Sequence, residues 1–317
     1  MRILVTGANG FVGRTVVPLL VERGHSVRAV VRKPDTAVPG VADVLSIGDI
    51  GPTTSWGRAL DGMEAVVHLA ARVHVMRDTV TDPLAAFRRV NTAGTRVLAE
   101  AAAAAGVKRL IYLSSVKALA DESQDEELSE VTEPDPHSPY GISKLEAERA
   151  LAEISSRTGL EVVVIRPPLV YGPGVGGNFR TLLSAVDRGI PLPLGALENR
   201  RSLIFVGNLA DAIRECLTHP QAAGGRFLVH DGRPMSTAEL VRAIADALGK
   251  PARLLPVPPS VLALGARLLR RRAMFDRVAG TLVVDDGAIR RALNWRPPYY
   301  PAYGLRQTAE WFKASRG

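Results

Sequence analysis

The chain is poor in cysteine and in aromatic residues. Its 317 residues include one cysteine, Cys216, which excludes an internal disulfide and a thiol-rich metal site, so no metal is expected. Aromatic residues make up 5% of the chain and do not alternate with basic residues as in single-strand nucleic-acid sites. The formal charge is +8, from 40 basic and 32 acidic residues. We interpret this excess as solvated surface that also attracts an anionic small substrate, and we expect no nucleic-acid partner.

Apolar runs long enough to cross a bilayer are also missing. The apolar segment Val257–Leu269 is too short and is broken by Pro258 and Pro259, although peripheral contact with a membrane surface stays open. The chain begins directly with a strand pattern, so no signal peptide is predicted and a cytoplasmic location is expected.

Strand and helix patterns alternate through the first half of the chain. Apolar strand patterns occur at Arg2–Val5, Ser26–Val31, Ala65–His68, Arg109–Leu113, Glu161–Ile165 and Arg226–Val229. Helical patterns include Thr92–Ala105, Ser143–Arg157, Val206–Leu217 and Thr237–Leu248. This order predicts an α/β fold with a doubly wound parallel sheet of the Rossmann type.

The amino-acid composition changes after about residue 166, where proline and glycine become frequent. We expect the sheet domain to comprise residues 1–166 with roughly 202–220. Residues 167–201 and 221–317 are expected to form a smaller C-terminal α/β lobe over the carboxyl edge of the sheet.

Three glycines follow the first strand pattern. Gly7, Gly10 and Gly13 stand between the apolar run Ile3–Val5 and a helical pattern. Glycine at this spacing allows a tight turn, close approach of a pyrophosphate and packing of the helix on the sheet. The N–H groups at the helix start then face the phosphates.

A serine, a tyrosine and a lysine form the second constellation. Ser115 follows a strand at its carboxyl end, where open α/β sheets bind ligands. Tyr140 and Lys144 are four residues apart at a helix start and share one face. A nearby ammonium lowers a tyrosine pKa, so Tyr140 is predicted to exchange a proton with a carbinol or carbonyl oxygen held by Ser115.

The second strand ends at Arg32, where an acidic residue would bind the ribose 2′-hydroxyl of NAD. A guanidinium can instead pair with a 2′-phosphate. This position favours NADP(H) and leaves NAD possible, because an arginine that stacks on adenine tolerates both.

Together these motifs resemble the extended short-chain dehydrogenases/reductases of the NAD-dependent epimerase/dehydratase type. The segments Thr6–Gly13, Ser115 and Tyr140–Lys144 carry the resemblance, which covers essentially the whole chain. It implies that the cofactor is bound by Gly7, Gly10, Phe11, Val12, Gly13, Arg32, Asp49, Ile50, Ala70, Ala71, Asn91, Tyr140, Lys144 and Pro167, and that catalysis rests on Ser115, Tyr140 and Lys144.

The resemblance also implies a substrate class. In nucleotide-sugar members, an asparagine and an arginine at the places of Asn178 and Arg201 bind the diphosphate, and the segment containing Leu194 frames the base. The implied substrate residues are Ser115, Lys117, Asn178, Leu194, Arg201 and Arg277. A UDP-sugar substrate, a role in polysaccharide biosynthesis and a homodimer are the corresponding expectations.

One difference from other members of the family narrows the set of reactions that we expect. The 4,6-dehydratases of the family place Asp-Glu directly after the hydroxyl residue, whereas Val116 and Lys117 stand here, so dehydration is not expected. His68 lies in an apolar strand and is interpreted as a core histidine.

Several functions stay open at this point. Hydride transfer at C4 of a UDP-hexose is favoured, as reduction of a 4-keto-6-deoxy sugar. The alternative is a UDP-glucose or UDP-N-acetylglucosamine 4-epimerase with tightly bound NAD. A cofactor-sensing binding protein and a reductase of apolar carbonyl compounds are the remaining hypotheses.

Overall fold

The structure is a computed structural model that describes residues 1–34, 36–73, 80–123, 126–268 and 272–316. Seven parallel strands form one sheet in the order β3-β2-β1-β4-β5-β6-β9. The strands are β1 (Arg2–Thr6), β2 (Ser26–Val31), β3 (Asp43–Ser46), β4 (Ala65–His68), β5 (Arg109–Leu113), β6 (Glu161–Arg166) and β9 (Arg226–Leu228). The predicted doubly wound parallel sheet is confirmed.

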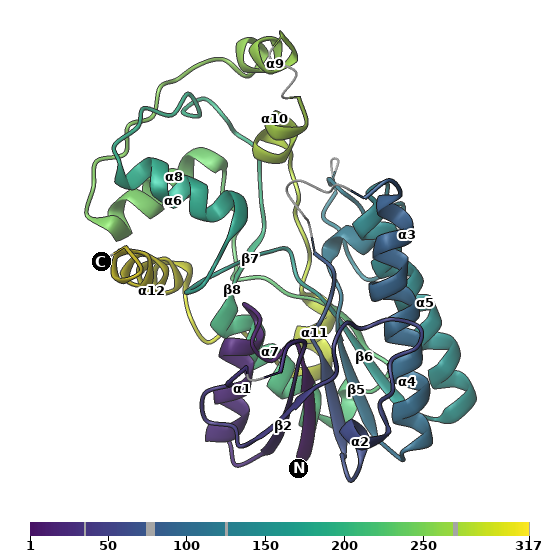
Figure 1. Cartoon of the computed structure of the whole chain (residues 1–317). Helices are drawn as coiled ribbons and strands as arrows, with labels where there is room; N and C mark the ends of the chain where they lie inside the picture. Colours follow the sequence, from purple (N-terminus) through teal and green to yellow (C-terminus); the bar gives the residue numbers. More distant parts are fainter. Residues whose placement is uncertain (35, 74–79, 124–125, 269–271, 317) are drawn as a thin grey trace.

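Helices cover both faces of this sheet (Figure 1). One face packs against α1 (Gly13–Glu22), α7 (Val206–Thr218) and α11 (Gly287–Leu293). The other face packs against α2 (Gly57–Leu60), α4 (Gly94–Ala104) and α5 (Pro139–Thr158). Because both faces are buried, the central strands read as continuous apolar runs.

Short helical segments connect these layers. They are α3 (Pro83–Phe87), the π-helix η1 (Arg88–Ala93) and the 3₁₀ helices η2 (Val116–Ala118) and η3 (Pro220–Ala222). The helix predicted from Thr92 therefore begins as a π-helix and becomes α-helical at Gly94, while α5 begins several residues before its predicted start at Ser143.

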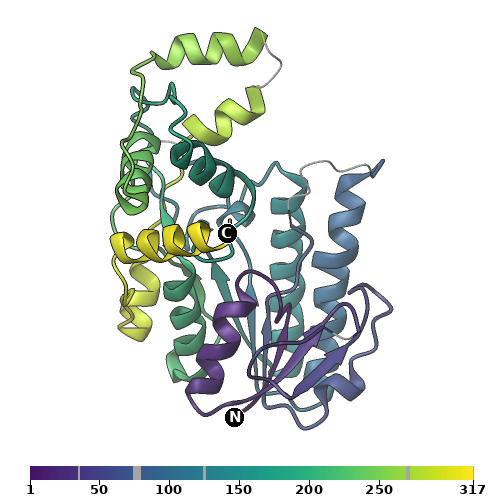
Figure 2. The same cartoon turned by 60° about the vertical axis from the view of Figure 1, so that its left-hand side comes forward.

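A second lobe stands beyond the carboxyl ends of the strands (Figures 1 and 2). A two-stranded parallel sheet of β7 (Leu169–Tyr171) and β8 (Leu203–Phe205) packs with α6 (Gly177–Asp187), α8 (Thr237–Leu248) and α12 (Pro301–Ala314) around a core of its own. Two further helices, α9 (Pro259–Leu268) and α10 (Arg272–Ala279), extend from this lobe.

The chain passes more than once between the domain built on the large sheet and the second lobe. Strand β9 pairs with β6, and α11 packs on the same face of the large sheet as α1 and α7. The predicted boundaries assign both elements to the smaller lobe, but the structure places them on the large sheet.

Candidate active site

The glycine turn connects β1 to α1. Gly7 has φ +67°, a left-handed conformation that side chains disfavour. A Cβ on Gly13 would lie 2.3 Å from the Gly7 carbonyl oxygen and 2.5 Å from that of Ala8. The missing side chain therefore lets the first turn of α1 rest on the loop before it.

The start of α1 offers donors to an anion. Among the described residues, the backbone N–H groups of Phe11 and Val12 have no hydrogen-bond acceptor, whereas Gly10 N–H donates to the Gly7 carbonyl at 2.9 Å. Free N–H groups at a helix start, next to a glycine-rich loop, fit a dinucleotide pyrophosphate. Phe11 and Val12 are half-buried beside this turn.

Two of the predicted cofactor-binding residues meet at the edge of the sheet. Arg32 follows β2 and Asp49 follows β3, and their side chains form an ion pair with an Nη1–Oδ1 distance of 3.6 Å. Both side chains are largely exposed, so this pair is weak and can rearrange around an incoming ligand. Next to Asp49, Ile50 fits against Gly94, where a Cβ would come within 2.5 Å of Ile50 Cγ2.

A buried polar chain supports the floor of the predicted cofactor site. Ala70 N–H donates to Thr6 Oγ1 at 3.2 Å, and His68 Nδ1 lies 2.7 Å from the same hydroxyl. On its other side His68 Nε2 lies 3.0 Å from Thr95 Oγ1. Burial, with a smaller contribution from the Lys144 charge, lowers the pKa of His68 to about 3. His68 is thus a neutral, hydrogen-bonded core histidine, as predicted, and Ala70 and Ala71 follow it half-buried.

Asn91 ties two segments of the site together. Its side chain accepts from Arg72 N–H at 2.8 Å and donates to the Arg72 carbonyl and to Ser143 Oγ, each at 3.0 Å. These bonds hold the loop after β4 against α5. Pro167 also joins two segments of the site. Its carbonyl accepts a hydrogen bond from the N–H of Val116, the residue after Ser115, at 3.0 Å.

Ser115, Tyr140 and Lys144 come together where β5 meets α5. Ser115 caps η2, with Lys117 N–H 3.2 Å from its hydroxyl, and its side chain is close enough to the Tyr140 hydroxyl to lower the pKa of that group. Tyr140 lies in the first turn of α5, whose N-cap Ser138 accepts from Gly141 N–H. Lys144 follows one turn later and is buried.

The pKa of Tyr140 differs from the sequence prediction. Burial raises the pKa of its hydroxyl to about 12, against a smaller lowering by the hydrogen bond with Ser115. Burial also lowers the pKa of Lys144 to about 7, so the lysine charge that was predicted to acidify the tyrosine is itself suppressed. In this structure Tyr140 is a protonated donor at neutral pH.

A buried ion pair beneath Lys144 was missed by the sequence analysis. Arg166 Nη2 lies 2.5 Å from Glu148 Oε2, and Ser114 Oγ donates to Glu148 Oε1 at 2.5 Å. The Glu148 charge raises the pKa of Lys144 and so opposes the effect of burial. Lys144 Nζ donates to the Leu113 carbonyl at 2.7 Å. The sequence does contain a signal for the Lys144–Glu148 contact, because Glu148 follows Lys144 by one helical turn.

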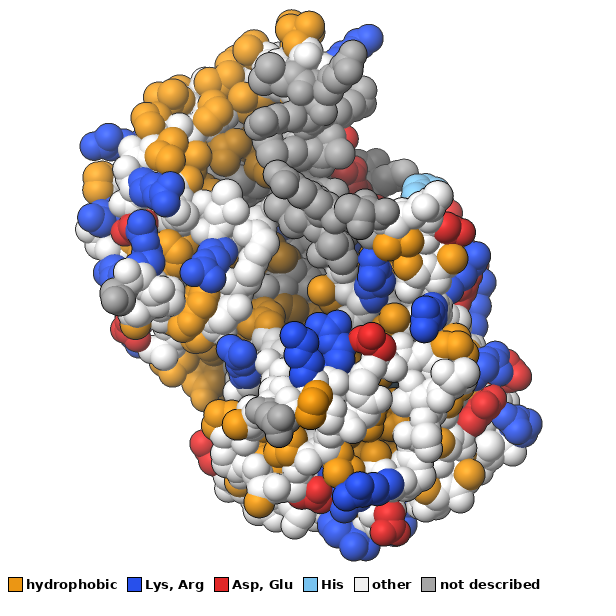
Figure 3. Space-filling view, viewed as in Figure 1, with side chains coloured by type: hydrophobic (Ala, Val, Ile, Leu, Met, Phe, Trp, Pro, Cys, Tyr) orange, Lys and Arg blue, Asp and Glu red, His pale blue; other side chains and the backbone are white. Residues whose placement is uncertain are grey.

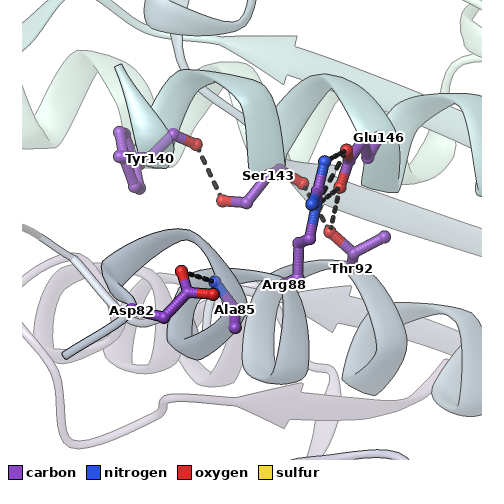
Figure 4. Close-up of polar contacts among 7 residues, drawn as sticks. All are labelled: Asp82, Ala85, Arg88, Thr92, Tyr140, Ser143 and Glu146. Carbon is purple, nitrogen blue, oxygen red and sulfur yellow. Dashed lines mark hydrogen bonds and ion pairs between the residues drawn. The ribbon is translucent and has the colours of Figure 1, made fainter. Parts of the chain in front are cut away.

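A second set of contacts anchors the helix that carries Tyr140 (Figure 4). Arg88 and Glu146 form a bidentate ion pair whose shortest N–O distance is 2.6 Å, and Thr92 Oγ1 donates to Glu146 Oε2 at 3.3 Å. Ser143 Oγ donates to the Tyr140 carbonyl at 2.8 Å. The Phe87 ring meets that of Tyr140 edge-on at 5.9 Å. These contacts fix the start of α5 relative to α3 and η1.

The predicted substrate residues are spread over the loop after β5 and the second lobe. Lys117 pairs with Asp121 at 3.1 Å. Asn178 is exposed in the first turn of α6, and Leu194 is half-buried against the second-lobe core.

Arg201 is held by both its backbone and its side chain. Its backbone pairs with Met235 in an antiparallel bridge, and its Nη1 donates to the Gly280 carbonyl at 3.2 Å. Burial lowers the pKa of its guanidinium, while Glu122 raises it. Arg277 lies in α10, and its side chain is outside those that the structure describes.

Comparison with known proteins agrees with this geometry. The family model for the NAD dependent epimerase/dehydratase family matches residues 3–229. A UDP-glucose 4-epimerase from Vibrio cholerae is 43% identical over 98% of this chain and 95% of its own.

Solved structures with similar folds include a Thermus thermophilus UDP-glucose 4-epimerase in complex with NAD, with a TM-score of 0.80, 28% identity and coverage of 99% of this chain and 100% of that one. A Thermotoga maritima UDP-glucose 4-epimerase with UDP-glucose has a TM-score of 0.79 and 25% identity over 100% of both chains.

Proposed function

The chain belongs to the NAD-dependent epimerase/dehydratase family, and on this premise we propose that it transfers a hydride at C4 of a UDP-hexose as a 4-epimerase. The observation that carries the proposal is the cluster of Ser115, Tyr140 and Lys144 at the carboxyl end of β5, the same edge of the parallel sheet at which the glycine turn follows β1. The 43% identity to a UDP-glucose 4-epimerase supports epimerisation, and the NAD dependent family and the NAD-bound Thermus thermophilus epimerase support NAD as the cofactor.

The proposed reaction uses Tyr140 twice. In the first half, Tyr140 takes the proton of the C4 hydroxyl while Ser115 holds the oxygen by a hydrogen bond, and this step requires the charged form of Lys144 to bring the pKa of Tyr140 down from about 12. In the second half, Tyr140 returns the proton to the C4 oxygen after the 4-ketone has presented its other face. NAD supplies the hydride acceptor and donor when bound, so the cofactor is regenerated and the net change is inversion at C4.

Lys144 adjusts the protonation of Tyr140 in this scheme. Its charged form favours the phenolate, and its neutral form leaves Tyr140 as the acid. Because the pKa of Lys144 is about 7, both forms are accessible near neutral pH. The Glu148 charge raises the pKa of Lys144 and so favours the charged form of the lysine.

We further propose that the second lobe supplies the nucleotide subsite. Arg201 and Asn178 would hold the diphosphate, and the backbone around Leu194 would frame the base. A guanidinium in half-buried surroundings suits a dense negative charge. Lys117 would reach the sugar from the loop after β5.

A second candidate function is NADPH-dependent reduction of a UDP-4-keto-6-deoxy sugar. Arg32 at the end of β2 favours it, because it offers a cation where a 2′-phosphate would lie. The raised pKa of Tyr140 also suits it, since reduction needs a hydride and one proton delivered to the ketone oxygen.

Cofactor retention separates the two candidates. Mass spectrometry of the denatured purified protein is expected to find bound NAD, and NMR is expected to show interconversion of UDP-glucose or UDP-N-acetylglucosamine with its C4 epimer. A protein that instead consumes one NADPH for each UDP-4-keto-6-deoxy-N-acetylglucosamine is a reductase. Loss of epimerisation without loss of NAD binding in Tyr140→Phe would assign the chemistry to the site.

A further inference from the structure

The helix α9 exposes an apolar face that the active site does not use. Val261, Leu264 and Leu268 are 56, 59 and 76% exposed, and none of the residues of α9 is buried. At about 100° per residue these three side chains fall within about 60° of one another on the helix. Figure 3 shows apolar side chains gathered at this end of the molecule.

The opposite face of α9 has a partner. Leu262, Ala263 and Ala266 are half-buried, and α9 packs against α10. The α9–α10 pair is therefore supported from within the protein, and the exposed face is directed away from it. An exposed apolar face of this kind marks an interaction surface.

The segment that contains α9 is rich in cations. Between Asp246 and Asp276 the sequence has six Lys or Arg and no Asp or Glu. Lys250, Arg253 and Arg267 are exposed, and Arg267 lies in the last turn of α9, about 60° beyond Leu264 on the helix. A segment that combines exposed apolar side chains with cations is complementary to anionic lipid headgroups over an acyl layer.

We propose that α9 docks the protein on the surface of an anionic lipid bilayer. Val261, Leu264 and Leu268 enter the boundary between headgroups and acyl chains, while Arg267 and Arg253 lie against the headgroup phosphates. The contact is interfacial, because no helix in the described part of the chain is long and apolar enough to cross a membrane.

This placement would hold the substrate lobe close to the bilayer. Helix α10 leads to Gly280, whose carbonyl accepts from Asn199 and from Arg201. The surface that touches the lipid is thus joined through one helix to the proposed diphosphate subsite. The docking itself does not depend on the identity of the sugar.

Vesicle sedimentation with the full-length protein tests the proposal. Wild type is expected to sediment with vesicles of phosphatidylcholine mixed with phosphatidylglycerol, and much less with phosphatidylcholine alone. Replacing Leu264→Asp together with Val261→Asp is expected to lower partitioning about tenfold or more, because two apolar contacts are lost and two anionic charges are added. High salt is expected to weaken the wild-type binding.

A matched control keeps the test specific. Val131 is 94% exposed far from α9 in the sequence, so Val131→Asp is expected to leave vesicle binding unchanged. Turnover of the nucleotide sugar in solution is expected to be unchanged in all variants. Equal binding to both vesicle types, or none to either, would overturn the proposal. A double variant that changes the oligomeric state but not the partitioning would assign the face to a second copy of the chain instead.

Discussion

At the scale of single residues, Tyr140 carries the proposed proton transfer. Removing its hydroxyl in Tyr140→Phe is expected to lower kcat by about 10²–10⁴-fold, the usual contribution of a general acid–base group. The ring remains to pack against Phe87, so the thermal midpoint is expected to stay near that of wild type. Steady-state kinetics measure the loss, and Tyr300→Phe, at an exposed tyrosine, is the control. Full activity of Tyr140→Phe would remove the residue from the mechanism.

We propose that Arg32 influences the choice between NAD and NADP(H). If its guanidinium contacts a 2′-phosphate, Arg32→Asp is expected to weaken NADPH binding by about ten- to hundredfold and to spare NADH, since charge-assisted hydrogen bonds contribute about 1.5–3 kcal/mol. Titration calorimetry with both cofactors measures the ratio. An equal loss for NADH and NADPH would mean that Arg32 stacks on the adenine. Because Asp49 pairs with Arg32, Asp49→Asn is expected to shift the ratio toward NADPH.

The residues of this cluster could be named from the sequence, but their protonation could not. The spacing of Tyr140 and Lys144 indicates a shared helix face, and it holds in α5. Their pKa values depend first on how deeply the fold buries them, and the pKa of Lys144 depends also on the Glu148 charge. Burial of that kind is set by tertiary packing and leaves no local pattern.

At the scale of elements, α1 depends on the absence of a side chain at Gly13. In Gly13→Ala the new Cβ would meet the Gly7 and Ala8 carbonyl oxygens, so α1 must shift away from the loop. We expect the free energy of unfolding to fall by about 1–3 kcal/mol and the affinity for NAD to fall with it. Chemical denaturation and cofactor titration are the measurements. Gly57→Ala is the control, because a Cβ there meets no atom within 4 Å.

Strand β4 makes stability depend on pH through His68. The folded protein holds the pKa of His68 near 3, while the unfolded chain has the ordinary value of 6.5. As the pH falls from 6.5 toward 3, the unfolded chain binds a proton that the folded protein excludes, so stability decreases by up to about 1.4 kcal/mol per pH unit. Above pH 6.5 this dependence disappears. Denaturation at several pH values is expected to show a shallower slope in His68→Gln than in His137→Gln, whose imidazole is exposed.

Most central elements could be predicted because their patterns are strong. Strands β2, β4 and β5 have the predicted bounds, and α8 begins at Thr237 behind a complete capping box. The edge strand β3 was missed because its four residues are only partly buried, and β7 and β8 are three residues each. Such short segments become strands through their partners rather than through their own sequence.

At the scale of the whole molecule, Arg201 lies between parts distant in sequence. Arg201→Ala is expected to raise KM for UDP-glucose about tenfold or more, while NAD retention stays unchanged. Competitive inhibition by UDP should be lost with it. Arg200→Ala, at the exposed neighbour that pairs with Glu127, is the control. If UDP does not inhibit the wild type at millimolar concentration, about the −4 kcal/mol range of binding free energy, the nucleotide-sugar proposal fails.

The second lobe was predicted in outline, and its interleaving with the sheet was not. Proline and glycine after residue 166 indicated that the chain leaves the sheet. Its later return to form β9 and α11 is a long-range pairing that local patterns do not encode, because β9 has three residues and finds its register only against β6.

This interleaving limits how the gene can be divided. A stop codon after β6 would remove β9 and α11 from the sheet, and a start codon at β7 would carry those two elements into a fragment with nothing to pair with. Neither half is therefore expected to express as a soluble product. A workable split would need two fragments produced together, cut at the exposed residues 251–252, so that each strand still reaches its neighbour.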